Sequence, residues 1–307
     1  MSGLSQDLHQ KLIAAVQALT PQEGYSRTAI SEVKLLRVDE AMSHTPVLYE
    51  PCIVIVLQGR KVAIVGGKEY IYDPQHYLVL AVPLPFTSET VASPESPLLA
   101  LSISLNLTTI AEILCHLDVE DEKTSRSVTL QSSPLEDDLG SALLRLITAA
   151  SDANEAKIIG PGLLKEFYYR VLIGDQGKAM RAALSNRGHF GQIANAIRTI
   201  HTGFNYHIDV SSLAKQAGMS AAAFHLHFKS YTGTTPIQYL KSTRLHQARF
   251  LMVKGGVTAA DASARVGYES PSQFNREFKR FFGHSPLKEA QRLRHLLKVK
   301  AETFWPD

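Results

Sequence analysis

The chain has 307 residues, of which 45% are hydrophobic and 20% are charged, and its formal net charge is +3. This length supports about two domains of ordinary size, and no apolar run is long enough to cross a membrane, which excludes a membrane-spanning protein. Two cysteines, Cys52 and Cys115, are too few for a disulfide framework, and the first residues lack the pattern of a secretion signal, so we expect a cytoplasmic protein.

Residues from about 31 to 105 have the composition of short strands. Gly66-Gly67 is a hairpin signal, and Pro83 and Pro85 bound the run that precedes them. The candidate strands are Cys52–Leu57, Lys61–Val65, Lys68–Tyr72, His76–Val82 and Leu98–Leu105. Several short strands with turn signals between them predict a small β-barrel or sandwich.

From residue 107 to about residue 185 the pattern becomes helical. One predicted helix follows the acidic start Glu136-Asp137-Asp138 and carries an apolar stripe at helical spacing, made of Leu135, Leu139, Leu143, Leu146 and Ile147. This stripe has two interpretations. It is a candidate seam of a homodimer formed through residues 133–150, or it is the face of a helix packed on the barrel.

The last part of the chain is basic, whereas the first part is acidic. Residues 187–307 contain 17 Lys/Arg and 7 Asp/Glu, and residues 1–186 contain 15 Lys/Arg and 22 Asp/Glu. A basic half joined to an acidic half is typical of a polyanion-binding module attached to a sensing or assembly module. On charge alone, a basic solvated surface explains the asymmetry equally well.

A repeated helical signature within the basic half favours DNA. Two copies occur 50 residues apart with the same spacing of two phenylalanines, a glycine and a proline: Phe224, Phe228, Gly233 and Pro236, then Phe274, Phe278, Gly283 and Pro286. Gly218 and Gly267 supply the tight turn before each copy. Two helix-turn-helix units in tandem suit two successive major grooves. The sequence therefore predicts a DNA-binding transcription factor.

Each predicted recognition helix has an inner and an outer face. We assign Ser220 and Ser270 as helix caps, with Ser211 capping the helix before Gly218. The inner faces are Ala221, Phe224, Phe228 and Tyr231 in the first unit, and Pro271, Phe274, Phe278 and Phe281 in the second. The outer faces are Ala222, His225, Leu226 and Lys229, and Ser272, Asn275, Arg276 and Lys279.

The two outer faces differ in chemistry. Asn275 can pair with adenine and Arg276 with guanine, each through two hydrogen bonds, while Ser272 suits a base edge or a phosphate. Lys279, one turn further, is better placed for a backbone phosphate. In the first unit, Ala222 and Leu226 suit thymine methyl groups, and His225 is the polar reader. We therefore expect the second unit to read by hydrogen bonds and the first to read shape and methyl groups. For any one of these residues, an exposed side chain with no DNA role is the competing interpretation.

Residues 236–253 form a long amphipathic stretch between the two units. A rigid helix of this length would hold the units about one DNA turn apart, roughly 34 Å. If their spacing does not match the groove repeat, the DNA must bend, at a cost of a few kcal/mol.

These motifs resemble those of the AraC/XylS family of bacterial transcription regulators. Gly267–Pro286 is similar to the family signature almost as it stands, and Arg244–Arg249 resembles the family's linker-helix motif. The N-terminal half resembles the companion domain of one branch of the family, a cupin-like barrel, at Pro46–Pro51, Ile55–Lys61 and Tyr72–Val79.

The resemblance implies an α+β fold with three segments. These are a cupin-like β-barrel sensor over residues 1–106, a helical dimerisation or linker region over 107–186, and an all-α DNA-binding domain with two helix-turn-helix units over 187–307. It implies a dimer that binds double-stranded promoter DNA, with RNA polymerase as a further candidate partner. The positions that match the family's base-reading helices are Ala222, His225 and Leu226, and Ser272, Gln273, Asn275 and Arg276.

An enzyme is the competing class, and the sequence argues against it. Metal-binding cupins carry a His-x-His pair with a nearby Glu and a later His, whereas His44 and His76 stand apart in the strand region. We therefore expect no metal, no cofactor and no catalytic residue. A third interpretation is a constitutive DNA-binding protein whose barrel serves only assembly.

The effector of a regulated protein is not specified by the sequence. The strand core accommodates an apolar or aromatic molecule, and it equally describes a filled core. Cys52 is a candidate sensor of aldehydes or oxidants, but a buried, unreactive cysteine is favoured because no cationic residue flanks it in the sequence.

Overall fold

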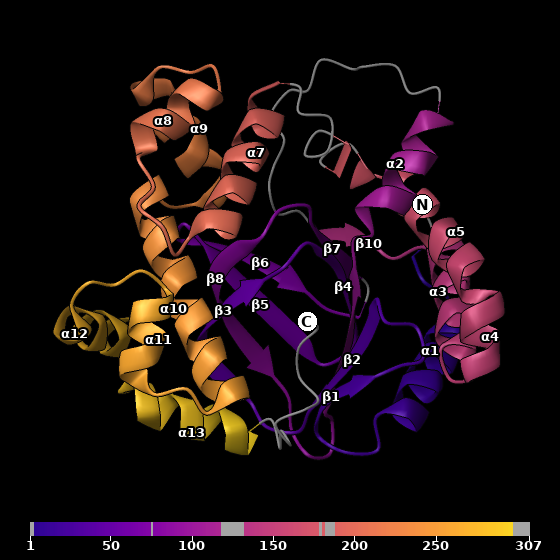
Figure 1. The fold of residues 1–307 in the computed structure, drawn as a ribbon. Coiled ribbons are helices and arrows are strands. Elements are labelled where there is room, and N and C mark those ends of the chain that lie inside the picture. The colour runs from indigo at the N-terminus through magenta and orange to yellow at the C-terminus, as the bar shows by residue number, and fades with distance from the viewer. Residues whose placement is uncertain (1–2, 75, 118–131, 178–179, 182–187, 297–307) are drawn as a thin grey trace.

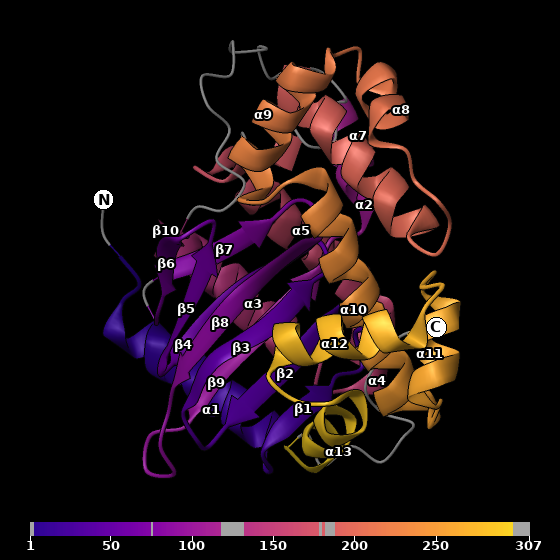
Figure 2. The same ribbon diagram turned by 90° about the vertical axis from the view of Figure 1, so that its left-hand side faces the viewer.

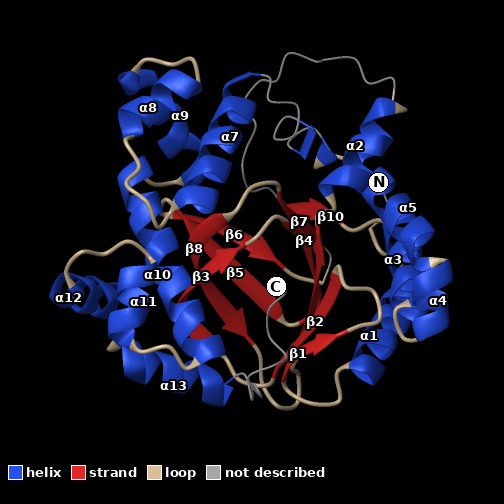
Figure 3. Cartoon of the chain, in the orientation of Figure 1, coloured by secondary structure: helices blue, strands red, loops and turns tan. Residues whose placement is uncertain are grey.

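The computed structural model describes residues 3–74, 76–117, 132–177, 180–181 and 188–296 (Figure 1). Two antiparallel sheets lie at the centre, and helices cover them on two sides (Figure 3). The expected α+β class, a β-rich N-terminal part with helices and an all-helical C-terminal part, is confirmed. The predicted boundary between residues 186 and 187 lies outside the described residues.

Within the described residues, the larger sheet has six strands and the smaller sheet has four. The order of the larger sheet is β1 (Gly24–Arg27), β2 (Val33–Val38), β9 (Leu98–Ser104), β4 (Cys52–Gln58), β7 (His76–Leu80) and β10 (Ser132–Pro134). The order of the smaller sheet is β3 (Met42–Tyr49), β8 (Leu84–Val91), β5 (Arg60–Val65) and β6 (Lys68–Tyr72). Figure 2 shows these strands from the side on which α10 and α12 lie against β3.

The six-stranded sheet contributes to two separate cores. One face meets the four-stranded sheet, where Val54, Tyr72 and Phe86 belong to one apolar cluster. The other face meets helices, where Ile53 and Ile55 belong to a second cluster. Strand β4 is therefore buried on both faces, which is why Cys52–Leu57 reads as a continuous apolar run instead of an alternating one.

In the part of the N-terminal half that the structure describes, five helices pack on the outer face of the larger sheet or on each other. They are α1 (Gln6–Leu19), α2 (Leu107–Cys115), α3 (Asp137–Ala149), α4 (Ala153–Ile158) and α5 (Gly160–Ile173). Helix α1 was not predicted from the sequence, and its Leu12 and Val16 are fully buried. Helices α2, α3, α4 and α5 therefore share one core with the larger sheet in the described residues.

The apolar stripe of residues 135–147 is not available as a dimer seam. All five of its side chains are buried in the core between the larger sheet and the helices. Helix α3 packs against α1 and α5, which cover the face that the stripe occupies. The expectation of dimerisation through this stripe is therefore wrong, and the alternative, a helix packed on the β-domain, is what the structure shows.

The C-terminal part consists of seven helices in the described residues. They are α7 (Gly188–Gly203), α8 (Val210–Gln216), α9 (Ala221–Thr232), α10 (Pro236–Gly255), α11 (Ala259–Arg265), α12 (Pro271–Phe282) and α13 (Pro286–Leu296). Helices α7 to α9 enclose one apolar cluster, α11 to α13 contribute to another, and α10 contributes residues to both. Among the described helices, none is both long and apolar enough to span a membrane.

Candidate nucleic-acid interface

The first helix-turn-helix unit consists of α8, a turn at Gly218 and α9. Gly218 adopts a φ of 63°, a left-handed conformation that a larger side chain would strain. Ser220 caps α9 as predicted, since its hydroxyl accepts a hydrogen bond from the Ala223 N–H at 3.3 Å. The cap of α8 is Asp209 and not Ser211. Hydrogen bonds from the Ser211 hydroxyl and N–H, and from Ser212, lower the pKa of Asp209 to about 2.

The second unit repeats this construction with α11, a turn at Gly267 and α12. The φ of Gly267 is 81°. Thr258 caps α11, and the predicted cap Ser270 accepts from the Gln273 N–H at 3.3 Å. Pro271 occupies the start of α12, where its missing N–H leaves no helical hydrogen bond open. The two recognition helices therefore start with the same type of cap.

The inner faces of the recognition helices differ from the prediction at their ends. The four central phenylalanines are fully buried as expected: Phe224 and Phe228 in α9, Phe274 and Phe278 in α12. Ala221 and Pro271 are exposed instead, because each is the first residue of its helix, next to the cap. At the other end of α12, Phe281 is half-buried and Phe282 is buried. Phe282 continues the i, i+4 row of Phe274 and Phe278.

All nine predicted DNA-contacting side chains are exposed to solvent. They are Ala222, His225, Leu226 and Lys229 on α9, and Ser272, Gln273, Asn275, Arg276 and Lys279 on α12. Leu226 has an exposed fraction of 69%, which is high for a leucine without an external partner. The amide of Gln273 donates to the Glu277 carboxylate at 3.2 Å, so this side chain turns along the helix in the described structure. The structure thus presents the predicted faces but tests none of their contacts with DNA.

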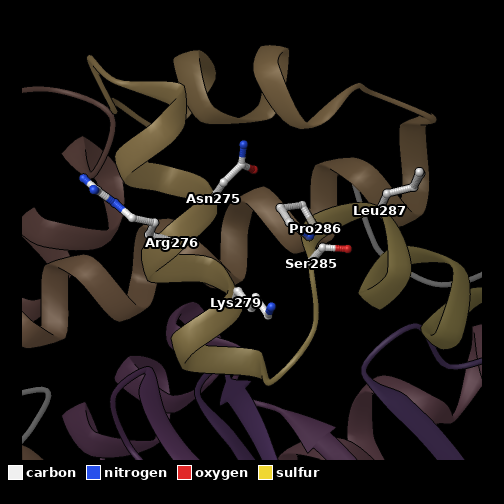
Figure 4. A pocket seen from close by; sticks show the side chains of 6 residues that line it. All are labelled: Asn275, Arg276, Lys279, Ser285, Pro286 and Leu287. Atoms are coloured by element: carbon white, nitrogen blue, oxygen red, sulfur yellow. The ribbon is translucent and has the colours of Figure 1, made fainter.

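A hollow beside α12 adds three residues that the sequence analysis missed. It is lined by Asn275, Arg276 and Lys279 of α12 and by Ser285, Pro286 and Leu287 at the beginning of α13 (Figure 4). Figure 4 shows Asn275 and Lys279 near Pro286, whereas the guanidinium of Arg276 extends away from it. The N-terminus of α13 carries partial positive charge that favours an anion.

The repeated sequence signature contains a signal for the α13 side of this hollow. Pro286 and Pro236 belong to the repeated signature, and each begins the helix that follows a recognition helix. Leu287 and its counterpart Ile237 are both exposed, with exposed fractions of 66% and 51%. The signature therefore marks a second surface in each unit as well as the recognition helix.

The two units are braced against each other by Arg244 of α10. Its guanidinium donates to the Phe204 carbonyl at 2.7 Å, to the Tyr206 carbonyl at 2.9 Å and to the Gly267 carbonyl at 3.0 Å. The first two carbonyls lie in the loop before α8, and the third lies in the turn of the second unit. A Cβ atom on Gly267 would lie 2.5 Å from the Asn205 carbonyl oxygen. Close backbone packing and three hydrogen bonds therefore hold one unit on the other.

The barrel histidines lie apart and belong to separate pairs. The His44 ring is 3.2 Å from the Glu89 carboxylate, and the His76 ring is 2.7 Å from that of Asp73. Within the described residues, no three His, Cys, Asp or Glu side chains come close enough to hold a metal ion. Cys52 is buried, and burial raises the pKa of its thiol to about 12, which favours the unreactive interpretation of this cysteine.

A double-sheet domain joined to a tandem helix-turn-helix domain defines a class of transcription regulators that carry both domains in one polypeptide. The comparisons agree with this class. The description "AraC-type transcriptional regulator N-terminus" matches residues 29–179, and the description "Helix-turn-helix domain" matches residues 213–292. The chain belongs to the AraC family of transcriptional regulators. This family consists of regulators and not of enzymes, which excludes the interpretation as a cupin enzyme.

Two curated relatives match parts of the chain. The lactose operon transcription activator of Staphylococcus xylosus is 25% identical over 46% of this chain and 50% of its own length. The HTH-type transcriptional regulator AlkR of Acinetobacter baylyi is 35% identical over 31% of each protein. The chain thus spans half or less of the length of these relatives.

A solved structure matches the whole arrangement more extensively. The crystal structure of unsaturated fatty acid bound wild-type ToxT from Vibrio cholerae superposes with a TM-score of 0.61 and 14% identity, covering 91% of this chain and 98% of that one. At this identity the likeness shows the fold alone.

Proposed function

We propose that this chain is a sequence-specific DNA-binding regulator of transcription that reads two successive major grooves. The observation that carries the proposal is the pair of matched recognition helices. Each begins at a serine cap, buries two phenylalanines and exposes the side chains of one face. Because Arg244 and Gly267 hold the units together, the two faces act as one rigid reader, and the DNA supplies whatever bend their geometry requires.

The exposed faces of α9 and α12 recognise DNA by different kinds of contact. Asn275 and Arg276 read base edges by paired hydrogen bonds, and Ser272 contributes a contact to a base or a phosphate. In the other unit, the exposed Leu226 and Ala222 suit thymine methyl groups, and His225 supplies a polar contact. Lys279 and the N-terminus of α13 border the same hollow, which suits a backbone phosphate.

Footprinting by the purified protein tests this proposal. The DNA would be the intergenic regions next to its own gene. Two protected patches per protomer, about one helical turn apart, support the proposal. The absence of protection on every such region, with folded protein and at low salt, would contradict it.

Lys279→Ala is expected to weaken binding to specific and random DNA alike. A lysine that neutralises one phosphate contributes about one unit to the slope of log affinity against log salt concentration. The measurement is a salt titration of DNA affinity for the variant and the wild type. Lys11→Ala, which removes an exposed lysine of α1 on the helical side of the larger sheet, is the control. An unchanged salt slope in Lys279→Ala would remove this residue from the phosphate contacts.

The proposal includes a response to a small molecule bound in the sheet domain. Ala81 and Val82, just after β7, belong to the same apolar cluster as the buried residues of α7, α8 and α9. The Tyr239 hydroxyl of α10 donates to the Pro83 carbonyl at 2.6 Å, and the His201 ring lies 2.8 Å from the same hydroxyl. Burial lowers the pKa of His201 to about 4, so its ring is neutral in this contact at physiological pH. The first reader unit thus shares part of its core with the sheet domain.

A second contact joins the tip of the β5–β6 hairpin to the end of the first recognition helix. Gly66 is in the hairpin turn, and Gly233 ends α9 with a φ of 74°. A Cβ atom on Gly233 would lie 2.7 Å from the Gly66 nitrogen, so the two backbones touch. A rearrangement of the sheets would therefore move the end of α9. This coupling favours an effector-responsive regulator over a constitutive one.

Repeating the footprint in the presence of small molecules distinguishes an effector-responsive regulator from a constitutive one. The panel would contain small aldehydes, phenols and fatty acids, since the fold relative ToxT was crystallised with an unsaturated fatty acid. A pattern that shifts with one compound supports effector control. A pattern that is indifferent to a broad panel favours the constitutive regulator, or one that responds to another protein such as RNA polymerase.

The protein is also proposed to be a homodimer, through a surface other than the one predicted. Helices α4 and α5 expose Ile158, Ile159, Tyr169 and Ile173, and α2, which packs on α5, exposes Leu107. Tyr169 and Ile173 are one helical turn apart on α5, and α5 lies at the edge of the molecule in Figure 1. Exposed apolar side chains on neighbouring helices are typical of an assembly surface.

Ile173→Lys is expected to convert the dimer to a monomer. A lysine at the centre of an apolar interface leaves a charge without a partner, whereas on an exposed monomer surface it costs little. Light scattering over a range of protein concentrations gives the mass of the variant and the wild type. Lys215→Ala, an exposed change on α8 in the C-terminal part, is the control. A wild type that is monomeric throughout this range would contradict the dimer.

A further inference from the structure

A lysine is buried between the two sheets without a carboxylate partner. Lys61 lies on β5, two residues before the core residue Ala63 and on the same face of the strand. Its exposed fraction is 7%, and its ammonium has one hydrogen bond, to the Thr90 hydroxyl at 3.2 Å. No acidic side chain in the described part of the chain pairs with it.

Two hydroxyl groups near Lys61 also lack hydrogen-bond partners. Tyr72 is the cross-strand neighbour of Lys61 on β6, and Thr90 is its neighbour on β8. Ser88 lies two residues before Thr90, on the same inward face of β8. The hydroxyls of Tyr72 and Ser88 are buried and lie close to each other, with the Tyr49 hydroxyl next to that of Tyr72, yet neither has a partner in good hydrogen-bond geometry within the described residues. Such buried polar groups are rare in folded proteins unless something satisfies them.

These groups share one chemical property, since all of them can donate hydrogen bonds. The ammonium has three donors and uses one, and neither hydroxyl donates in a hydrogen bond of good geometry to another described residue. Burial lowers the pKa of Lys61 to about 8, and no neighbouring charge contributes, so the ammonium is still the main form at neutral pH. One positive charge and a set of donors call for a ligand with one negative charge and several acceptor atoms.

We propose that Lys61, Tyr72 and Ser88 form a binding site for the carboxylate of a small organic acid. The carboxylate accepts from the Lys61 ammonium and from the two hydroxyls, and the rest of the acid lies against the apolar residues between the sheets, such as Val54 and Leu80. A carboxylate carries one charge and matches one ammonium, whereas a phosphate would bring a second, uncompensated charge into an apolar interior.

The site is placed to act on the DNA reader. Lys61 and Tyr72 belong to the two strands of the hairpin whose tip at Gly66 touches Gly233 at the end of α9. Ser88 belongs to the strand that follows Pro83, the residue whose carbonyl accepts from Tyr239. This inference deepens the proposed effector response and rests on it in one respect, namely that the bound acid would change DNA affinity. The binding of the acid does not depend on it.

Thermal unfolding with added acids tests the binding without DNA. The probes are formate, acetate and benzoate, with chloride and inorganic phosphate at the same ionic strength for comparison. Binding to the native state raises Tm with probe concentration. We expect at least one of the three carboxylates to raise the Tm of the wild type, and calorimetric titration to show one site per chain. No rise with any carboxylate, or a rise equal to that in chloride or phosphate, would overturn the proposal.

Three variants locate the site. Lys61→Met is expected to abolish the Tm rise while leaving Tm without probe no lower than in the wild type, because it removes a buried charge that has no counter-ion. Tyr72→Phe and Ser88→Ala are each expected to weaken binding about tenfold, the usual effect of losing one hydrogen bond to a charged group. Lys68→Met, at an exposed lysine of the same hairpin, is the control and should bind as the wild type does.

The variants also separate this proposal from the DNA-reading one. Equal binding by Lys61→Met and wild type would overturn the carboxylate site. So would a large loss of Tm in Lys61→Met without probe, because that would make the lysine a structural group. Both results leave the DNA-binding proposal intact, since neither measurement contains DNA. Conversely, a failed footprint would leave the binding result standing.

Discussion

Glu289→Ala is expected to lower the free energy of unfolding by about 3–5 kcal/mol, the largest effect expected of any single substitution considered for this chain. The exposed fraction of Glu289 is 1%, and it lies on α13 between two arginines. The Arg292 guanidinium donates to it through two hydrogen bonds, at 2.9 and 3.0 Å, and Arg249 of α10 lies 3.4 Å away. Removing the carboxylate leaves Arg249, whose side chain is only 13% exposed, without a counter-charge.

Arg249 makes this loss severe because it has further contacts that fix its position. It donates to the Pro46 carbonyl of β3 at 3.0 Å, and its guanidinium lies 4.3 Å from the centre of the Phe282 ring. Burial lowers the pKa of Arg249 to about 10, partly offset by Glu289, yet the side chain stays charged at neutral pH. An arginine held by the sheet domain, by α12 and by α13 cannot turn out into solvent without losing these contacts.

Urea unfolding of Glu289→Ala and of the wild type measures the effect. Glu269→Ala, at an exposed glutamate near the turn of the second unit, is the control and should change stability by less than about 0.5 kcal/mol. The double variant Glu289→Met with Arg249→Met should be more stable than Glu289→Ala alone, because it removes both charges of the pair. If Glu289→Ala and Glu269→Ala unfold at the same urea concentration, Arg249 finds another partner and the expectation is wrong.

The tandem reader could be predicted from the sequence because its signals are local. The two phenylalanines of each recognition helix, the serine cap and the glycine turn each act within about two helical turns, so spacing along the chain determines their positions. The wrong assignments of inner-face residues are at the ends of the recognition helices. Ala221 and Pro271 fit the inner face by periodicity, yet they are exposed because periodicity does not show how far a neighbouring helix extends. The DNA contacts of the outer faces stay predictions.

The sheet domain was harder to predict because its decisive contacts are distant in the sequence. Strands β3 and β8 are not among the candidate strands of the sequence analysis. Pro83 and Pro85 bound the run before them there, yet Pro85 lies within the paired strand β8, and Pro46 lies within β3. The stripe on α3 is equally apolar whether a partner chain or α1 covers it, and α1 is more than a hundred residues away. Lys61 reads as an ordinary exposed strand residue until the sheets close over it. The position of a polar group inside a barrel therefore had to come from the structure.

Arg276→Ala is expected to cost about 1–3 kcal/mol of binding free energy on the specific site and to relax base preference at one position. The side chain is exposed on α12, and no described acid pairs with it. In Figure 4 its guanidinium extends away from the α13 terminus, where Lys279 and Asn275 lie, so it is not directed at the proposed phosphate contact. A guanidinium that is free to form two parallel hydrogen bonds matches guanine in the major groove.

The decisive comparison is with Lys279→Ala, a change of charge one turn further along the same helix. Each variant would be titrated against the footprinted site, against the same site with each base pair changed in turn, and against random DNA. Arg276→Ala should lose affinity for the intact site, and its affinity should no longer depend on the identity of one base pair. Its affinity for random DNA should change little. Lys279→Ala should lose affinity for all three. If both variants lose the same affinity on specific and random DNA, Arg276 contacts a phosphate and not a base, and the division of labour on α12 is wrong.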